Sequence, residues 1–151
     1  MIRPFAKSDF ETYLAMSHEF YNSDATDHQV PEDHFRRTFE ESVKGSPLAR
    51  AWMVIDPGQP DEPAGYLLAS ITWGNEFGGR VSWLEELYLK EAARGKGLGR
   101  QALEDAMEEL KTKDGVKGFR LEVAPANAAV SDLYRRMGFT KVPYDPWWLV
   151  L

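Results

Sequence analysis

The sequence predicts an α/β domain of the α+β type, in which helices flank a central, mostly antiparallel mixed sheet. Three observations support this fold class. Some segments alternate or run apolar over strand length, others repeat apolar residues at helical spacing, and turn-forming residues separate them. The predicted order is strand, two helices, three strands, helix, strand, helix, strand. Since 151 residues suit one hydrophobic core, residues 1–151 are expected to form a single domain.

The first three elements follow from strand-forming and capping residues near the N-terminus. Ile2–Phe5 has strand composition, and Ser8-Asp9-Phe10-Glu11 has the form of a capping box that opens a helix. A turn over residues 22–24 ends this helix. Pro31 begins a second helix, which closes at Gly45–Pro47. One side of the first helix carries Tyr13, Leu14, Ser17, Phe20 and Tyr21, and the second helix is expected to point Phe35, Phe39 and Val43 inward.

Three strands are predicted next, separated by residues that favour turns. Ala51–Ile55 and Ala64–Trp73 are expected to be hairpin partners across an exposed loop, residues 56–63, that contains three prolines and a glycine. Gly74–Gly79 then connects to a third strand, Arg80–Leu89. These strands would form the middle of the sheet.

The second half of the chain is predicted to contain two helices and two further strands. The first helix has apolar residues at i, i+3, i+4 and i+7 and ends near Gly115. Alternation from Phe119 to Val123 indicates a strand, Asn127 is placed to cap a short helix that ends at Gly138, and Trp147–Leu151 resembles a last strand. The apolar face of the first helix is Leu103, Ala106, Met107 and Leu110.

A glycine-rich, basic stretch lies where the third central strand gives way to the longer of these helices. It reads Arg94, Gly95, Lys96, Gly97, Leu98, Gly99 and Arg100. Glycines let the backbone wrap an anion with several N–H groups pointing inward, and the N-terminus of the following helix adds the positive end of its dipole. The stretch therefore predicts a pyrophosphate-binding loop.

Two other nucleotide-binding motifs, Walker A and the dinucleotide fingerprint, fit this loop less well. Walker A requires Ser or Thr after Gly-Lys, and Lys96 is followed by Gly97. The dinucleotide fingerprint G-x-G-x-x-A fits Gly97, Gly99 and Ala102. Glu122 follows about twenty residues later, but this fingerprint usually lies on the first strand–helix turn of its domain. A nicotinamide-dependent enzyme stays an alternative, as does a turn whose glycines only end a strand.

Composition limits the classes of function. The net charge is −6, which leaves no broad basic face for nucleic acid, so none is expected as a partner. The absence of cysteine removes disulfides, thiolate metal sites and a covalent cysteine intermediate. His18, His28 and His34 lack zinc spacing, so no metal is expected. Without a signal region or a run of membrane-spanning length, we expect a cytoplasmic protein that does not contact membranes.

A second landmark lies downstream of the loop. Asn127 is followed seven residues later by Tyr134, and then by Arg135-Arg136-Met137-Gly138-Phe139. Together with Arg94–Gly99, preceded by Leu84–Leu89, this segment resembles the GNAT superfamily of acetyl-CoA-dependent N-acetyltransferases. The family patterns are Q/R-x-x-G-x-G/A in the pyrophosphate loop after the fourth strand, and N-x6-Y-x-x-x-G-F. The resemblance covers essentially the whole chain and implies the GNAT fold with acetyl-CoA as co-substrate.

The resemblance also implies where coenzyme A would lie. In that family the pantetheine arm runs beside the fourth strand and is held by its main chain, which corresponds here to Leu87, Tyr88 and Leu89. Two pantetheine amides can pair with an open strand edge, and the Leu87 amide would polarise the thioester carbonyl. Asn127 belongs to the same cofactor-binding set. Tyr134 matches the family's general acid, which protonates the departing sulfur.

Acetyl transfer to an amine also needs a base, because an alkyl amine with a pKa of about 10.4 is protonated at neutral pH. Glu85 and Glu86 are the candidates. Strand alternation places Glu85 with Val81 and Trp83, where partial burial would raise its pKa, so Glu85 is preferred. It also matches an acidic position in the spermidine/spermine-type branch of the family. A bulge would reverse the two faces, and a water chain would leave neither glutamate essential.

The connection between the first two helices carries residues that fit an acceptor site. The predicted acceptor-binding set is Glu19, Tyr21, Asp24 and Asp27, together with Glu85. A cleft with this charge would favour a small cationic amine, such as a polyamine, an aminoglycoside or a lysine-like amino acid. The prediction is therefore an enzyme that moves acetyl directly to a primary amine in a ternary complex.

Several alternatives stay open. The acceptor could be a protein N-terminus or a lysine side chain, and the donor could carry a longer acyl group. A protein that binds acyl-CoA as a sensor, without catalysis, is an alternative of another class. Family resemblance and the aromatic segment that contains Trp147 and Trp148 favour a homodimer.

Overall fold

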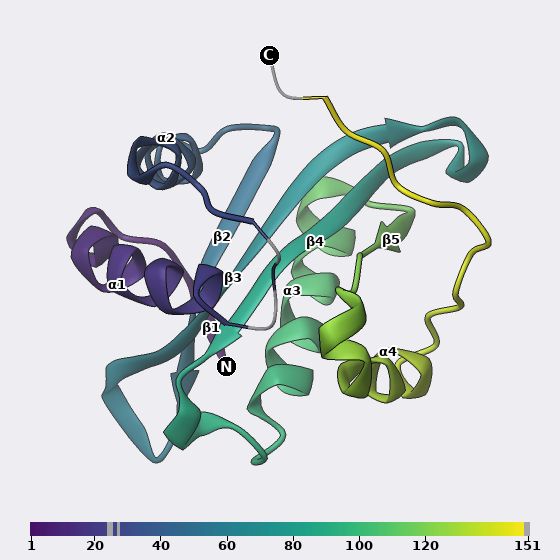
Figure 1. Ribbon diagram of the computed structural model, residues 1–151. Coiled ribbons are helices and arrows are strands. Elements are labelled where there is room, and N and C mark those ends of the chain that lie inside the picture. The colour runs from purple at the N-terminus through teal and green to yellow at the C-terminus, as the bar shows by residue number, and fades with distance from the viewer. Residues whose placement is uncertain (24–25, 27, 150–151) are drawn as a thin grey trace.

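The protein forms one five-stranded sheet with helices on both faces (Figure 1). The structure is a computed structural model that describes residues 1–23, 26 and 28–149. The strand order is β1-β2-β3-β4-β5; the first four strands pair antiparallel, and β5 pairs parallel with β4. Helices α1 and α2 cover one face, and α3 and α4 lie on the other. The predicted α/β class with a mostly antiparallel mixed sheet is confirmed.

The elements follow the predicted order up to the last helix. The strands are β1 Ile2–Pro4, β2 Ala49–Asp56, β3 Gln59–Gly74, β4 Gly79–Leu89 and β5 Gly118–Arg120. The α-helices are α1 Phe10–Tyr21, α2 Glu32–Val43, α3 Leu98–Asp114 and α4 Ser131–Arg136. Short 3-10 turns are η1 Lys7–Asp9, η2 Asn75–Phe77, η3 Glu91–Ala93 and η4 Pro125–Val130.

Two hydrophobic cores, one on each face, hold the helices to the sheet. On the first face, α1 and α2 bury an aromatic cluster against β2, β3 and β4, which includes Tyr13, Phe20, Phe35, Phe39 and Tyr66. On the second face, α3 packs Leu103, Ala106 and Leu110 against Trp52 and Leu67. The helical periodicities seen in the sequence therefore mark the buried faces correctly.

A β-bulge interrupts β4 at Glu85. Leu84 pairs with Ala69 of β3 and Glu86 pairs with the preceding residue, Leu68, so Glu85 has no partner across the ladder. An extra residue in one strand reverses the alternation of side chains beyond it. Leu84 accordingly joins the α3 core, whereas Glu86 points to the α1 face, where Tyr88 also lies.

Beyond the bulge, the other edge of β4 has no strand beside it. The ladder between β4 and β5 ends at Trp83 and Arg120, so the two strands separate there. On the β3 side, the Lys90 amide donates to the Ala64 carbonyl (2.9 Å), which makes this a hydrogen-bonded pair. Because such pairs alternate along an antiparallel ladder, the main-chain groups of Leu87 and Leu89 point to the open edge.

Several local predictions are corrected by the structure. The predicted capping box at Ser8–Glu11 is wrong: the Asp9 carboxylate instead accepts the Ala6 amide (2.7 Å) and pairs with Arg3. The loop over 56–63 shortens to a turn, because β3 already begins at Gln59.

The fifth strand and the last strand also differ from expectation. The predicted strand from Phe119 to Val123 ends at Arg120, since β4 turns away from it. The predicted strand Trp147–Leu151 is not formed by residues 147–149, which have no ladder partner within the described chain; residues 150–151 lie outside it. Trp147 is 94% exposed.

Substituting Gly65 should strongly destabilise the sheet. A Cβ at Gly65 would lie 2.0 Å from the Tyr88 carbonyl oxygen, because Gly65 of β3 pairs with Leu89 of β4. Gly65→Ala is therefore expected to lower the free energy of unfolding by about 1–3 kcal/mol or more, measured by urea denaturation. The control is Gly58→Ala, whose Cβ would meet its nearest atom at 3.4 Å and which should cost less than about 0.5 kcal/mol. Equal losses in the two variants would contradict this explanation.

Candidate active site

The glycine-rich loop adopts a conformation that only glycine accepts readily. Gly95 and Gly97 have φ angles of 73° and 81°, and Gly97 is the residue immediately before α3. The backbone amides of residues 95–100 donate no hydrogen bond to any described residue. Unpaired amides at the N-terminus of a 17-residue helix form an anion-binding surface.

The cations of this loop lie at the surface, and two of them have partners. The Arg94 Nε donates to the Leu89 carbonyl (2.9 Å), and its guanidinium lies 5.9 Å from the centre of the Tyr88 ring. Arg100 pairs with Glu104 of the next helical turn (2.8 Å). Within the described chain, Lys96 forms no ion pair. The Leu89 carbonyl, expected to be open to pantetheine, is thus already bonded to Arg94.

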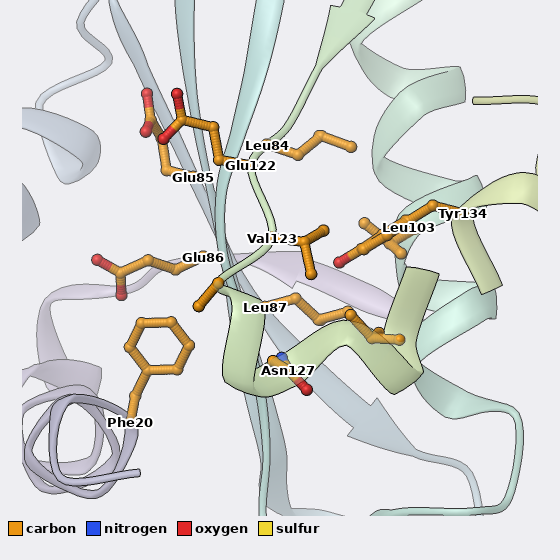
Figure 2. Close-up of a pocket in the computed structure, with 12 residues that line it drawn as sticks. Phe20, Leu84, Glu85, Glu86, Leu87, Leu103, Glu122, Val123, Asn127 and Tyr134 are labelled. Carbon is orange, nitrogen blue, oxygen red and sulfur yellow. The ribbon is translucent and has the colours of Figure 1, made fainter. Parts of the chain in front are cut away.

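A cleft of about 530 Å³, measured to its open mouth, lies where β4 and β5 separate (Figure 2). It is bounded by β4, by α3, by the segment after β5 and by α4. Residues that line it are Phe20, Leu84, Glu85, Glu86, Leu87, Leu103, Glu122, Val123, Ala124, Asn127, Val130 and Tyr134. We call it the donor cleft, because it contains the open edge of β4 beside Leu87.

Tyr134 reaches the donor cleft from α4. Figure 2 shows its ring beside Leu103, with the hydroxyl pointing toward Val123. The side chain is half-buried and packs against Phe139, with ring centres 5.9 Å apart. Its hydroxyl has no hydrogen-bond partner among the described residues, and burial raises its pKa. The phenol is therefore protonated at neutral pH and can donate its proton into the cleft.

Asn127 also lines the donor cleft, but it does not cap a helix as predicted. It lies inside η4, and its side chain makes no capping hydrogen bond there or at the start of α4. Its φ and ψ of −101° and 25° mark a kink between two short helical turns.

Glu86 is the carboxylate that the fold encloses. Its Oε1 accepts the Tyr21 hydroxyl (2.7 Å) and its Oε2 accepts the Tyr66 hydroxyl (2.6 Å). Burial raises the pKa of Glu86, and the two tyrosine hydrogen bonds oppose that rise without cancelling it. Tyr21 comes from α1 and Tyr66 from β3, so three elements converge on this carboxylate.

Glu85 lies on the outside of the bulge. The expectation of partial burial is wrong: Glu85 is exposed, and its carboxylate accepts a hydrogen bond from Ser70 of β3. Figure 2 shows the carboxylates of Glu85 and Glu122 pointing the same way, whereas that of Glu86 points toward Phe20 of α1. Strand alternation fails here because the extra residue of the bulge shifts the pattern.

A second cleft of about 510 Å³ opens on the α2 side of the bulge. We call it the acceptor cleft. It carries hydroxyl and charged groups from α2, β2, β3 and β4, and Glu85 and Glu86 line both clefts. Its lining residues are Thr38, Ser42, Ala49, Arg50, Leu68, Ala69, Ser70, Glu85 and Glu86.

The predicted acceptor residues on α1 are engaged with β4. Tyr21 binds Glu86, and Glu19 accepts a hydrogen bond from the Tyr88 hydroxyl; burial and Glu19 raise the pKa of Tyr88 to about 12. Asp24 and Asp27 lie outside the described residues. His28, in the same connection, stacks edge-on against Tyr21 (5.8 Å) and Trp148 (4.8 Å).

Sequence reasoning gave no site role to several polar residues that line the two clefts, namely Thr38, Ser42, Arg50, Ser70 and Glu122. It also missed Tyr66, which is not among the lining residues but binds Glu86. The first four look like ordinary helix and strand residues, and Tyr66 looks like any core aromatic. Glu122 was noted only for the dinucleotide fingerprint.

The described part of the chain shows neither a metal-type cluster nor a membrane-length helix. No group of three or more His, Asp or Glu side chains is arranged there to hold a metal ion. None of its helices is both long and apolar enough to cross a bilayer.

A model of the acetyltransferase (GNAT) family matches residues 13–139, so the chain belongs to that family. A thialysine N-epsilon-acetyltransferase of Bos taurus is 33% identical over 84 residues, which are 54% of this chain. The match spans only about half of that relative, 48% of its length. The family and the mostly antiparallel sheet make the nicotinamide-dependent alternative wrong.

Solved structures share the fold over nearly the whole chain. An integron cassette protein from the Cole Harbour Salt Marsh metagenome superposes with a TM-score of 0.80 at 23% identity, over 99% of this chain and 90% of its own. A possible acetyltransferase from Clostridium difficile 630 gives 0.80 at 13% identity, over 100% and 97%. The aminoglycoside acetyltransferase AAC(6')-Iy, bound to CoA-S-monomethyl-acetylneamine, gives 0.78 at 18% identity, over 100% and 97%. At these identities, the likeness establishes the fold.

Gly97→Ala should separate cofactor binding from stability. Gly97 and Gly45 have similar φ angles, 81° and 78°, and neither Cβ would meet an atom within 4 Å. Either substitution is expected to cost about 1–2 kcal/mol of stability, because L side chains disfavour this conformation. Only Gly97→Ala should also weaken acetyl-CoA binding, about tenfold or more by titration calorimetry, since it re-aims the amides before α3. Equal affinity in the two variants would show that these amides do not bind the cofactor.

Proposed function

We propose that this protein transfers an acetyl group from acetyl-CoA to a primary amine, by direct attack in a ternary complex. One observation carries the proposal: a loop of unpaired amides before α3 and an unpartnered tyrosine flank the open edge of β4. Residues 1–151 would form one catalytic domain of the acetyltransferase (GNAT) family.

The donor would lie along the open edge of β4. The pyrophosphate oxygens would accept hydrogen bonds from the backbone amides of residues 95–100, and Lys96 would add a positive charge. The pantetheine amides would pair with the Leu87 main chain, next to Tyr88 and Leu89. Asn127 and Tyr134 would line the reactive end, because both face the donor cleft.

Tyr134 would act as the general acid. The amine nitrogen forms a bond to the thioester carbonyl carbon, the carbon–sulfur bond breaks, and the Tyr134 hydroxyl gives its proton to the sulfur. The Leu87 amide would stabilise the charge that develops on the carbonyl oxygen. A phenol whose pKa is raised by burial keeps its proton until the sulfur needs it.

Glu86 would be the base that removes the proton of the amine. It lines both clefts, and a carboxylate with a raised pKa is better matched to neutral pH than an ordinary one. Glu85, initially preferred, is exposed and better suited to binding the cationic acceptor. A water chain from the amine to Glu86 would serve the same purpose.

The acceptor would enter through the acceptor cleft. Hydroxyls of Thr38, Ser42 and Ser70 beside two carboxylates fit a small cationic amine that carries polar groups. Arg50 also lines the cleft, but its charge is paired with Asp114. An aminoglycoside or a thialysine-like amino acid has this character, in keeping with the names of two similar proteins. A polyamine, as in the spermidine/spermine-type branch, fits the carboxylates alone. A protein N-terminus or lysine is the alternative acceptor.

The function is tested by binding and by thiol release. The purified protein should bind acetyl-CoA and not NAD in calorimetric titrations. With acetyl-CoA present, it should release thiol in the presence of polyamines, aminoglycosides or lysine-like amino acids, and more slowly with peptides. Binding without turnover on any amine would favour the sensor alternative, and absence of acetyl-CoA binding would refute the proposal. The predicted homodimer and cytoplasmic location stay predictions; size-exclusion chromatography with light scattering checks the former.

Tyr134→Phe should impair the chemical step more than donor binding. It removes the proton donor while keeping the ring that fills the cleft wall. We expect kcat to fall about 100-fold, with KM for acetyl-CoA changed by less than about threefold. Tyr144→Phe, at a side chain that is 75% exposed and outside the cleft, should leave both constants unchanged. An unchanged kcat in Tyr134→Phe would exclude this residue as the acid.

A further inference from the structure

Glu86 is held by two tyrosines that come from opposite directions. Tyr21 donates to one carboxylate oxygen (2.7 Å) and Tyr66 to the other (2.6 Å). Tyr66 is fully buried, with 0% of its surface exposed, whereas Tyr21 is half-buried. The carboxylate therefore cannot rotate without losing at least one of these hydrogen bonds.

The surroundings of Glu86 contain no cation in direct contact among the described residues. From α1 it faces Tyr21 and, without a hydrogen bond to it, Tyr13. From β3 it faces Tyr66, and from β4 the like charge of Glu85; His28 lies farther off in the α1–α2 connection. Burial and Glu85 disfavour the charged form, while both tyrosines and His28 favour it. Its ionised form thus depends mainly on two neutral hydroxyls rather than on a salt bridge.

A purely structural role would not require this arrangement. An ionisable group enclosed among aromatic side chains costs stability, and apolar residues of similar size would pack at least as well. Glu86 also lies where the donor and acceptor clefts meet, because it lines both. Its neighbour Glu85 shows the ordinary alternative, an exposed carboxylate bound only by Ser70.

We infer that Tyr21 and Tyr66 are positioning residues for Glu86, which keep its carboxylate ionised and aimed at the junction of the two clefts so that it can accept the proton of the acceptor amine. The inference rests on the proposed acetyl transfer. Tyr66 anchors the carboxylate from the core, and Tyr21 holds the oxygen on the more accessible side. Neither tyrosine touches the reacting atoms, so each acts through Glu86.

Tyr21 and Tyr66 differ in the other residues that they contact. Tyr21 also contacts His28, and His28 contacts Trp148 of the C-terminal segment. A change at Tyr21 can therefore affect acceptor binding as well as the carboxylate. Tyr66 contacts other core aromatics, including Tyr13 at 5.2 Å and Tyr88 at 5.8 Å, so its effect should be confined to Glu86.

The pH profile of activity tests the inference. Removing either hydroxyl takes away a hydrogen bond that lowers the pKa of Glu86, so the pKa should rise further. In Tyr66→Phe and in Tyr21→Phe, the acidic limb of kcat/KM is expected to move up by about one pH unit, which is tenfold in rate at a pH below the limb. Tyr21→Phe should additionally raise KM for the amine.

Tyr13→Phe is the matched control. Tyr13 is as buried as Tyr66, packs against it, and gives its hydroxyl to no oxygen of Glu86. The same loss of a hydroxyl in the same core should leave the acidic limb in place. A limb that stays in place in both Tyr66→Phe and Tyr21→Phe, or moves equally in Tyr13→Phe, would overturn the inference.

A second measurement needs no activity. Side-chain carbon-13 NMR of glutamate-labelled protein, with Glu86→Gln to identify the signal, follows the titration of Glu86 directly. The pKa of Glu86 should lie above the usual value for glutamate and rise again in Tyr66→Phe or Tyr21→Phe. If no amine is acetylated, the proposed function fails while this titration still decides whether the tyrosines control Glu86. An unshifted Glu86 titration in both variants would refute their role, and Tyr21→Phe, at the more exposed site, covers a failure of Tyr66→Phe to fold.

Discussion

The bulge at Glu85 is the constraint on which the arrangement of both clefts depends. One extra residue between Leu84 and Glu86 reverses the alternation of β4, so that the strand serves two cores in turn. Before the bulge, Leu84 belongs to the α3 side; after it, Glu86 and Tyr88 face α1. Without the bulge, strict alternation would direct Glu86 toward the apolar core under α3, away from the hydroxyls of Tyr21 and Tyr66.

β4 also separates from β5 close to the bulge, and the two features together shape the donor cleft. Because β5 ends at Arg120, the donor cleft opens along the second half of β4, and the main chain at Leu87 faces it. A strand edge of this kind is normally covered or charged to prevent unwanted pairing. Here residues of α4 and η4 line the opening, and the unpaired amides before α3 lie near its end, so an extended ligand with an anionic group would fit this edge.

The sequence predicted those features that depend on local geometry. The glycine-rich loop before α3 could be recognised because a left-handed backbone conformation requires glycine, which is visible in the sequence. Tyr134 was selected by its spacing from Asn127. The faces of Glu85 and Glu86 were left open, because a bulge was an alternative to strict alternation, and its presence is set by pairing with Leu68 and Ala69 of β3 rather than by the sequence of β4. The partner Tyr66 was missed for the same reason: twenty residues separate it from Glu86, and nothing local marks it. Within the described chain, residues 147–149 form no strand although their composition favours one, because strand formation also depends on pairing with a neighbouring strand, which composition does not reveal.

Tyr88 links the cofactor loop to the acceptor side. Its hydroxyl donates to Glu19 of α1 and its ring lies under Arg94, while Arg94 bonds to the Leu89 carbonyl next in sequence. An anion bound at the loop would compete for the Arg94 guanidinium, since a charge-assisted contact with phosphate is stronger than one with a neutral carbonyl. Any release of Arg94 would free the Leu89 carbonyl at the open edge of β4, where the pantetheine amides would pair. Binding of a pyrophosphate at the loop and pairing of pantetheine with the edge of β4 would thereby be coupled through Arg94, which bonds to the last residue of the strand that carries Glu86.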